Sequence, residues 1–157
     1  MPQPQSYTRL TDFSDEEHQG EHRRRVELLP CPAQDVPRLW RLVWPVLEKA
    51  VSRQDEFAEQ DVYEDLCSRK SQLWLAVEGS RLLGVGVTQI AVYPRKRVCL
   101  LLYVAGEGWV RWRHLLDGIC DWARSQGCVE LEFSGRRGWL KRLPDWRFKH
   151  VTMSKRL

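Results

Sequence analysis

The chain has 157 residues, of which 43% are apolar, so it has room for one domain with a substantial hydrophobic core. No apolar run is long enough for a membrane-spanning helix, and no signal peptide is recognisable, so we expect neither membrane insertion nor export. The net charge of +4 is too small to identify a nucleic-acid-binding protein by itself.

The five cysteines stand at positions 31, 67, 99, 120 and 128, an odd number with no C-x-x-C pair. Several fall within apolar strand or helix patterns, which is typical of buried, reduced thiols rather than of a disulfide framework or a zinc site. We therefore expect no metal site and a reducing compartment.

Residues 1–25 contain too few apolar side chains to fold alone. An acidic run at residues 15–17 and a basic run at residues 22–25 dominate the segment, and only Tyr7, Leu10 and Phe13 offer apolar anchors. So little burial cannot offset an ordering cost of about 1–2 kcal/mol per backbone residue. We predict that residues 1–25 form a polar arm bound by protein partners, and that residues 26–157 form the folded domain.

The domain begins with a short strand predicted over Val26–Leu29. Apolar residues then recur at helical spacing over residues 36–51, with Asp35 at the cap position and Pro37 in the first turn, where proline is tolerated. Pro45 lies well inside this pattern, and we expect it to split the helix into two parts bent around a groove.

A second helix and a hairpin follow. Asp61, with an acid three residues further on, predicts a cap for a short helix over residues 61–68. Residues 72–78 and 81–93 are predicted strands, joined at Gly79-Ser80 by a two-residue turn of the Gly-X kind. A bulge or a close backbone approach is expected at two glycines of the second strand, Gly84 and Gly86.

The stretch from Val98 to Gly127 organises the rest of the chain. An unbroken apolar run, Val98–Val104, is typical of a central strand buried on both faces, and a loop with Gly106 and Gly108 follows. Residues 112–123 form one apolar stripe at helical spacing, ended at Gly127. The next strand, residues 128–133, is predicted to place Val129, Leu131 and Phe133 on the core face. Together these elements predict a βαβ unit, whose mouth is a natural phosphate site.

The last part of the chain is predicted as a short helix over Trp139–Leu143 and a strand or strand pair over Trp146–Leu157. From Gly135 to Leu157 there are eight Lys or Arg residues against the single Asp145. This pattern favours a solvated basic surface, because no aromatic recognition signature accompanies it. A nucleic-acid-binding surface stays open as an alternative.

This order of elements resembles the GNAT acetyltransferase family. The hairpin at Gly79-Ser80, Trp122–Gly127 before one strand and Leu143–Phe148 before the last carry the resemblance, which covers residues 26–157. It implies an α/β fold with a GNAT-like mixed central sheet flanked by helices. The stretch Gly135–Trp139 makes the chain most similar to GNAT-related proteins encoded by bacteriophages and prophages.

In that family, the loop after the central strand holds the pyrophosphate of acetyl-CoA on backbone N–H groups. The cofactor-binding candidates that the resemblance implies are Val104, Gly106, Gly108, Trp109, Arg111 and Arg113. The loop departs from the family pattern, since Glu107 adds negative charge while Trp109 and Trp112 add bulk. These departures predict that the loop is too crowded and too acidic for the cofactor.

The family's catalytic acid is a tyrosine on the last helix, where this chain has Lys141 or Leu143, and no tyrosine follows Tyr103. The family's base is usually a glutamate near the central strands, for which Glu107 is the one loose candidate. Tyr103 and Glu107 are therefore weak catalytic candidates, and the pattern favours Tyr103 as a core aromatic residue with its hydroxyl satisfied.

From these departures we predict a non-catalytic GNAT-fold protein without a cofactor. It would be a bacteriophage virion or assembly component, found in the virion or the host cytoplasm, that binds protein partners through residues 1–25 and its aromatic surface. The alternative is an active N-acetyltransferase that transfers acetyl from acetyl-CoA to an amine.

Overall fold

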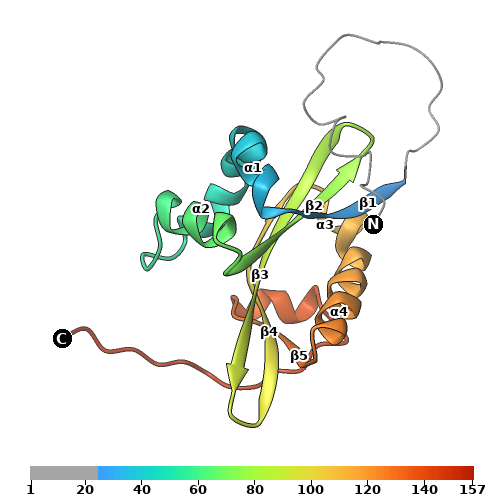
Figure 1. Ribbon diagram of the computed structural model, residues 1–157. Helices are drawn as coiled ribbons and strands as arrows, with labels where there is room; N and C mark the ends of the chain where they lie inside the picture. Colours follow the sequence, from blue (N-terminus) through green and yellow to red (C-terminus); the bar gives the residue numbers. More distant parts are fainter. Residues whose placement is uncertain (1–24) are drawn as a thin grey trace.

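The computed structural model describes residues 25–157, so the predicted partner-binding arm lies outside the described residues except for Arg25. The strands are β1 (Val26–Cys31), β2 (Ser71–Glu78), β3 (Arg81–Tyr93), β4 (Lys96–Gly106) and β5 (Cys128–Phe133) (Figure 1). The α-helices are α1 (Val36–Val51), α2 (Glu59–Cys67), α3 (Trp109–Trp112) and α4 (Leu116–Ser125). The 3-10 helices are η2 (Ala33–Asp35), η3 (Arg113–Leu115) and η4 (Arg137–Lys141). Within the described residues, every helix is too short or too polar to span a bilayer.

One mixed sheet, in the order β1-β2-β3-β4-β5, forms the centre of the domain. Neighbouring strands from β1 to β4 are antiparallel, whereas β4 and β5 are parallel. A parallel pair needs a long crossover, and the segment from α3 to α4 supplies it. The predicted α/β class, mixed sheet and βαβ unit are confirmed.

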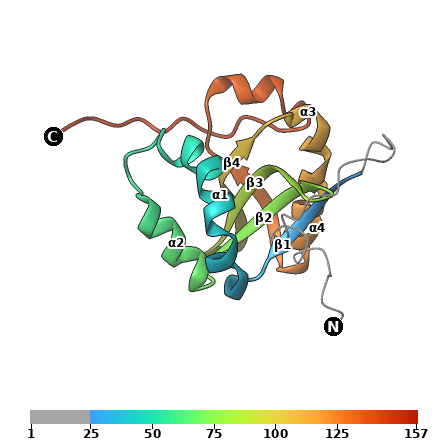
Figure 2. The ribbon, with the colours of Figure 1, turned by 90° about the horizontal axis from the view of Figure 1, so that it is seen from above.

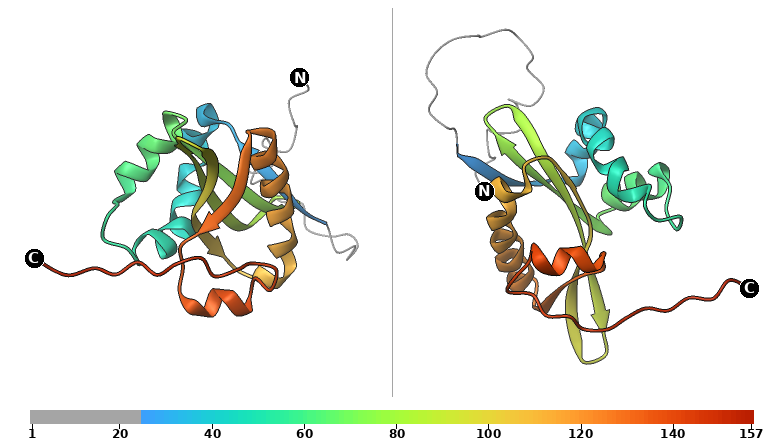
Figure 3. Two further views of the ribbon diagram at one scale, coloured as in Figure 1. Left: turned by 90° about the horizontal axis from the view of Figure 1, so that it is seen from below. Right: turned by 180° about the vertical axis from the view of Figure 1, so that it is seen from behind.

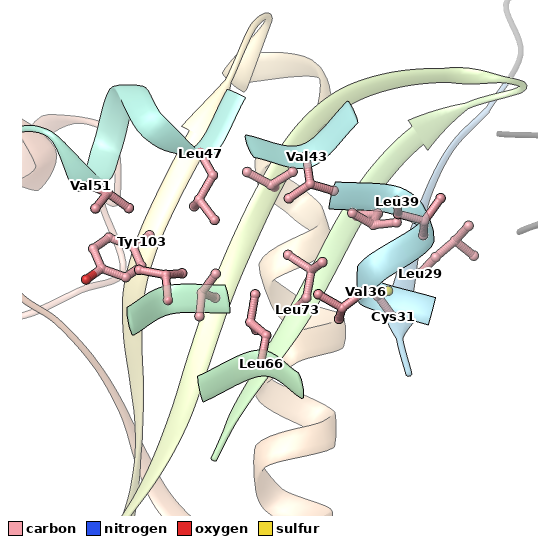
Figure 4. Close-up of a cluster of buried hydrophobic side chains, with 14 of the residues drawn as sticks. Leu29, Cys31, Val36, Leu39, Val43, Leu47, Val51, Leu66, Leu73 and Tyr103 are labelled. Atoms are coloured by element: carbon pink, nitrogen blue, oxygen red, sulfur yellow. The ribbon is translucent and has the colours of Figure 1, made fainter. Parts of the chain in front are cut away.

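Helices cover both faces of the sheet, with α1 and α2 on one side and α4 on the other (Figure 2). Helix α1 packs on the sheet because Leu39, Val43 and Leu47 recur every four residues and are all fully buried. Their side chains converge with Leu73 of β2 and Tyr103 of β4 (Figure 4). This core fixes the position of β4, the strand that carries the candidate site.

Helix α1 runs unbroken from Val36 to Val51, so the predicted split at Pro45 is wrong. Pro45 is exposed, and so is Arg41, whose carbonyl loses its helical partner at this position. Water can satisfy that carbonyl on the solvent side, while the buried face on the opposite side holds the two halves of the helix in line.

Helix α2 begins at Glu59, earlier than predicted. Asp61 is not its cap but lies in its first turn, where its carboxylate accepts a hydrogen bond of 2.8 Å from the backbone N–H of Ala58. Asp61 therefore plays the role of the reciprocal acid, which the prediction gave to Glu64.

The β2–β3 hairpin has the predicted two-residue turn, with Glu78 opposite Arg81 and Gly79 at a φ of 61°. The register shifts next to Ala76, which leaves Leu83 as an extra residue beside Gly84. The bulge predicted from the glycine is therefore confirmed.

Strand β5 carries a bulge that reverses part of the predicted pattern. Arg97 lies opposite Cys128, whereas the next residue, Val98, lies opposite Glu130, so Val129 is skipped. Val129 is consequently 68% exposed, and Cys128 is buried on the α4 side. The predicted faces are wrong at these two residues because a bulge shifts the alternation by one position. All five cysteines are free thiols.

The segment after β5 differs most from the prediction. A 3-10 helix, η4, replaces the helix predicted over Trp139–Leu143, and no strand forms over Trp146–Leu157. The chain runs beside β5 and then extends away from the body (Figure 3). Lys149 holds it there through ion pairs with Glu130, at 2.8 Å, and with Glu132. The eight basic residues after Gly135 are all exposed, and nucleic-acid binding there stays a prediction.

Candidate active site

The central feature of the site is the point at which β4 and β5 part. The two strands pair in parallel only as far as Leu101, which lies opposite Phe133 at the end of β5. Directly after this pair, Leu102 is an extra residue in the β3–β4 register, which makes it a β-bulge. Strand β4 continues to Gly106, and on its β5 side no other strand of residues 25–157 pairs with it. The backbone from Leu102 to Gly106 therefore presents an open edge.

The loop at the end of this edge is held by the bulge of β3. The carbonyl oxygen of Leu83 accepts a hydrogen bond of 2.9 Å from the N–H of Glu107. Gly106 lies directly against the same residues, since an added Cβ would be 2.4 Å from the Leu83 oxygen and 2.5 Å from the Cα of Gly84. Its φ of 139° also excludes an ordinary side chain. Only glycine fits at position 106.

Trp112 also holds the loop that follows β4. Its Nε1–H donates a hydrogen bond of 2.8 Å to the carbonyl of Glu107, and its ring is 95% buried against Gly84 of β3. The Trp112 side chain, which was predicted to crowd the cofactor loop, is therefore packed in the core instead. Gly108, with a φ of 62°, then turns the chain into α3.

Trp109 is the least satisfied polar side chain of the site. Its ring packs edge-to-face on Trp112 and on Trp139 of η4, with centroid distances of 4.8 and 5.1 Å. Its Nε1–H is buried and has no hydrogen-bond partner among the described residues. A buried donor without an acceptor is destabilising, and such groups are characteristic of places where a ligand supplies the acceptor. The sequence identified Trp109 only as added bulk.

Charges around the loop are largely paired. Arg111 forms an ion pair with Glu78, and Glu107, whose side chain is 77% exposed, lies 3.8 Å from Arg81. The negative charge predicted to repel a pyrophosphate is thus offset by an arginine. Arg113 is exposed and forms no ion pair with a described residue, so it is the free cation of the predicted set.

Tyr103 lies one residue beyond the bulge, on the face of β4 that α1 covers. It is buried, and its hydroxyl points past Val51 at the end of α1 (Figure 4). Burial raises the pKa of this phenol, and the nearby carboxylates of Glu56, Asp65 and Asp61 raise it further. Along β4, Tyr103 and Glu107 are separated by about 13 Å, so the two catalytic candidates do not converge on one atom.

A concentration of acids beside Tyr103 was missed from the sequence. From Gln54 to Ser68 the chain has six acidic residues and no Lys or Arg: Asp55, Glu56, Glu59, Asp61, Glu64 and Asp65. The segment comprises α2 and the loop before it. Three of its carboxylates lie close enough to raise the pKa of Tyr103. The net charge of this short segment is the signal in the sequence that would have revealed these acids. Within residues 25–157, no cluster of His, Cys, Asp or Glu is arranged to hold a metal ion.

No protein-family model and no curated protein matches the sequence. Solved structures do match. A probable acetyltransferase superimposes with a TM-score of 0.64 at 18% identity, over 83% of this chain and 99% of that one. An aminoglycoside acetyltransferase from an uncultured soil metagenomic sample, in complex with sisomicin, has a TM-score of 0.63 at 14% identity, over 84% and 96%. A GNAT family acetyltransferase from Staphylococcus aureus has a TM-score of 0.59 at 12% identity, over 85% and 99%.

The fold is the GNAT fold. At these identities the similarity establishes architecture, and the structural resemblance predicted from the order of elements is confirmed. The prediction of a non-catalytic virion component is wrong, because most of the similar structures, including the three named above, are described as acetyltransferases. They favour the alternative that the sequence offered, an N-acetyltransferase. The departures in the loop misled the prediction, since Trp112 packs inward and Glu107 faces an arginine.

Proposed function

We propose that the protein is an N-acetyltransferase that uses acetyl-CoA. The observation that carries this proposal is the parting of β4 from β5 after Leu101, directly above the glycine loop. It leaves a strand edge with unpaired backbone groups, and an extended amide-containing chain such as pantetheine can pair with them. Acetyl-CoA, when bound, supplies the acetyl group as a thioester.

The residues present fit this cofactor. The buried, unpartnered Nε1–H of Trp109 offers a donor, and the open backbone from Val104 to Gly106 offers main-chain partners. Gly106 and Gly108 let the backbone approach a phosphate closely. Arg113 supplies a free positive charge, while Arg111 acts indirectly by holding α3 to Glu78.

The acceptor is an amine that approaches from the α1–α2 side. The acids between Gln54 and Ser68 attract an ammonium group, and their charges reach Tyr103 beside the bulge. The aminoglycoside acetyltransferase among the structural neighbours offers a precedent for a polycationic acceptor on this fold.

Tyr103 is the proton donor of the reaction. Its phenol is protonated at neutral pH, burial raises its pKa further, and it lies beside the point at which β4 and β5 part. When acetyl-CoA is bound, its C–S bond would break as the C–N bond forms, the amine's proton would pass to solvent, and the sulfur would receive a proton from Tyr103. Solvent then returns the proton to Tyr103. Glu107, exposed and facing Arg81, holds the loop rather than acting as a base.

The proposal is tested by calorimetric titration with acetyl-CoA, followed by measurement of thiol release in the presence of spermidine. We expect saturable binding of one acetyl-CoA per chain and amine-dependent thiol release. Desulfo-CoA, which lacks the thiol, serves as a ligand that binds without reacting. Failure of both acetyl-CoA and desulfo-CoA to bind would reject the proposal.

A further inference from the structure

A pocket lies at the start of β4, at the opposite end of this strand from the glycine loop. Its volume is about 510 Å³, within the range of small-molecule sites. Four parts of the chain that are distant in sequence build it: the end of β1 with η2, the start of β2, the end of β3 with the start of β4, and the end of α4. Strand β4 separates it from the loop by about 30 Å, so it is distinct from the proposed cofactor site.

The charged residues that line the pocket are all basic. Arg69, Lys70 and Arg97 line it, and among the residues that the structure describes no Asp or Glu does. Lys70 is paired with Asp65 at 2.9 Å, whereas Arg69 and Arg97 form no ion pair with any described residue. Two uncompensated guanidinium groups therefore face this space, and such groups recognise phosphates with high geometric specificity.

The polar side chains beside Trp122 already have partners. Thr88 accepts a hydrogen bond of 2.9 Å from Trp74 Nε1, and the Gln72 amide donates to the carbonyls of Cys31 and Leu73. Arg69 and Arg97 are therefore the lining groups that a charged ligand would engage.

The remaining lining suits a flat apolar body. Trp122 and Ile90 contribute to the wall, and the Trp122 ring is fixed by an edge-to-face contact with Trp74, with centroids 5.1 Å apart. An aromatic ring in the ligand gains contact area and a defined orientation from a fixed indole.

We propose that this pocket binds a small phosphate monoester that carries a ring, of about the size of a mononucleotide. The phosphate faces Arg69 and Arg97, and the ring lies against Trp122. The inference does not depend on the acetyltransferase proposal, because no residue is shared between the two sites.

The test is an NMR titration of the backbone amides with AMP, and with adenosine as the uncharged control, up to about 10 mM. We expect AMP to shift the amides of Ser71, Thr88 and Arg97, and adenosine to bind at least about tenfold more weakly. Shifts confined to Leu102–Val110, an absence of shifts, or equal binding of adenosine would overturn the proposal. Acetyl-CoA affinity, measured with and without AMP, reports separately on the cofactor site.

Two variants sharpen this test. Arg97→Gln should weaken AMP binding about tenfold, whereas Arg137→Gln, an exposed arginine of η4, should leave it unchanged. Equal weakening by Arg97→Gln and Arg137→Gln would indicate general charge attraction and reject a built site.

Discussion

The indole of Trp112 lies so close to Gly84 that a Cβ at residue 84 would be 2.5 Å from Cζ2 of Trp112. The same indole donates its Nε1–H to the carbonyl of Glu107 in the glycine loop. The bulge of β3 beside Gly84 also binds the loop, through the carbonyl of Leu83. The candidate cofactor loop can therefore take this position because residue 84 of β3 is a glycine, which leaves room for the Trp112 indole.

Gly84→Ala should therefore destabilise the protein by about 1–3 kcal/mol, because the rigid indole cannot move aside without breaking its bond to the loop. Gly86→Ala is the matched control, since its nearest heavy atom would be 3.8 Å from the new Cβ. Urea unfolding measures both. Equal stability of the two variants would show that Trp112 does not press on Gly84.

Trp109→Phe should lower the affinity for acetyl-CoA about tenfold, because the substitution removes a buried donor that the described chain leaves unpartnered. The ring contacts with Trp112 and Trp139 are largely kept, so the melting temperature should change little. Trp44→Phe, on α1, controls for loss of an indole elsewhere. Unaltered affinity in Trp109→Phe would remove this residue from the cofactor site.

Tyr103→Phe should lower kcat on the order of a hundredfold, with the KM for acetyl-CoA unchanged, because only the proton donor is lost. The raised pKa of Tyr103 keeps the wild-type phenol protonated through neutral pH, so the deficit should persist from pH 6 to pH 9. Tyr63→Phe on α2 is the control. A kcat for Tyr103→Phe equal to that of the wild type would exclude Tyr103 as the acid.

Lys149→Met should raise the pKa of Glu130. Hydrogen bonds from Lys149 and then Lys96 lower the pKa of this carboxyl from 4.5 to about 2. A folded-state pKa below the unfolded value contributes stability above pH 4.5, and that contribution is lost as the pH falls toward 2. NMR titration of the side-chain carboxyl measures the shift, with Lys155→Met, further along the same segment, as control. A Glu130 titration that is the same in both variants would show that Lys149 does not hold the segment to β5.

Much of this fold follows from periodicity. The apolar spacing of α1, the turn at Gly79-Ser80 and the order strand, glycine loop, helix, strand are local patterns that the structure reproduces. The bulges at Leu102 and Val129 are not local, because they depend on how two strands pair, and each places side chains on faces that simple alternation does not predict.

The site was harder to predict for the same reason. The sequence shows tryptophans in the loop but not that Trp112 turns inward over a glycine of β3. Nor does it show that the Nε1–H of Trp109 has no hydrogen-bond partner among residues 25–157. The carboxyl-terminal segment was predicted as a strand or strand pair, yet side-chain contacts such as the ion pairs of Lys149 and Arg147 hold it beside β5. A strand needs a partner edge as well as a pattern.

The central claim is that the open edge of β4 receives acetyl-CoA. Hydrogen–deuterium exchange of the backbone amides, resolved by NMR with and without acetyl-CoA, measures this directly. Slower exchange concentrated between Leu102 and Val110 is the predicted result, because ligand groups would take up the unpaired N–H groups of this segment. Exchange rates in that segment that acetyl-CoA leaves unchanged at saturation would contradict the account.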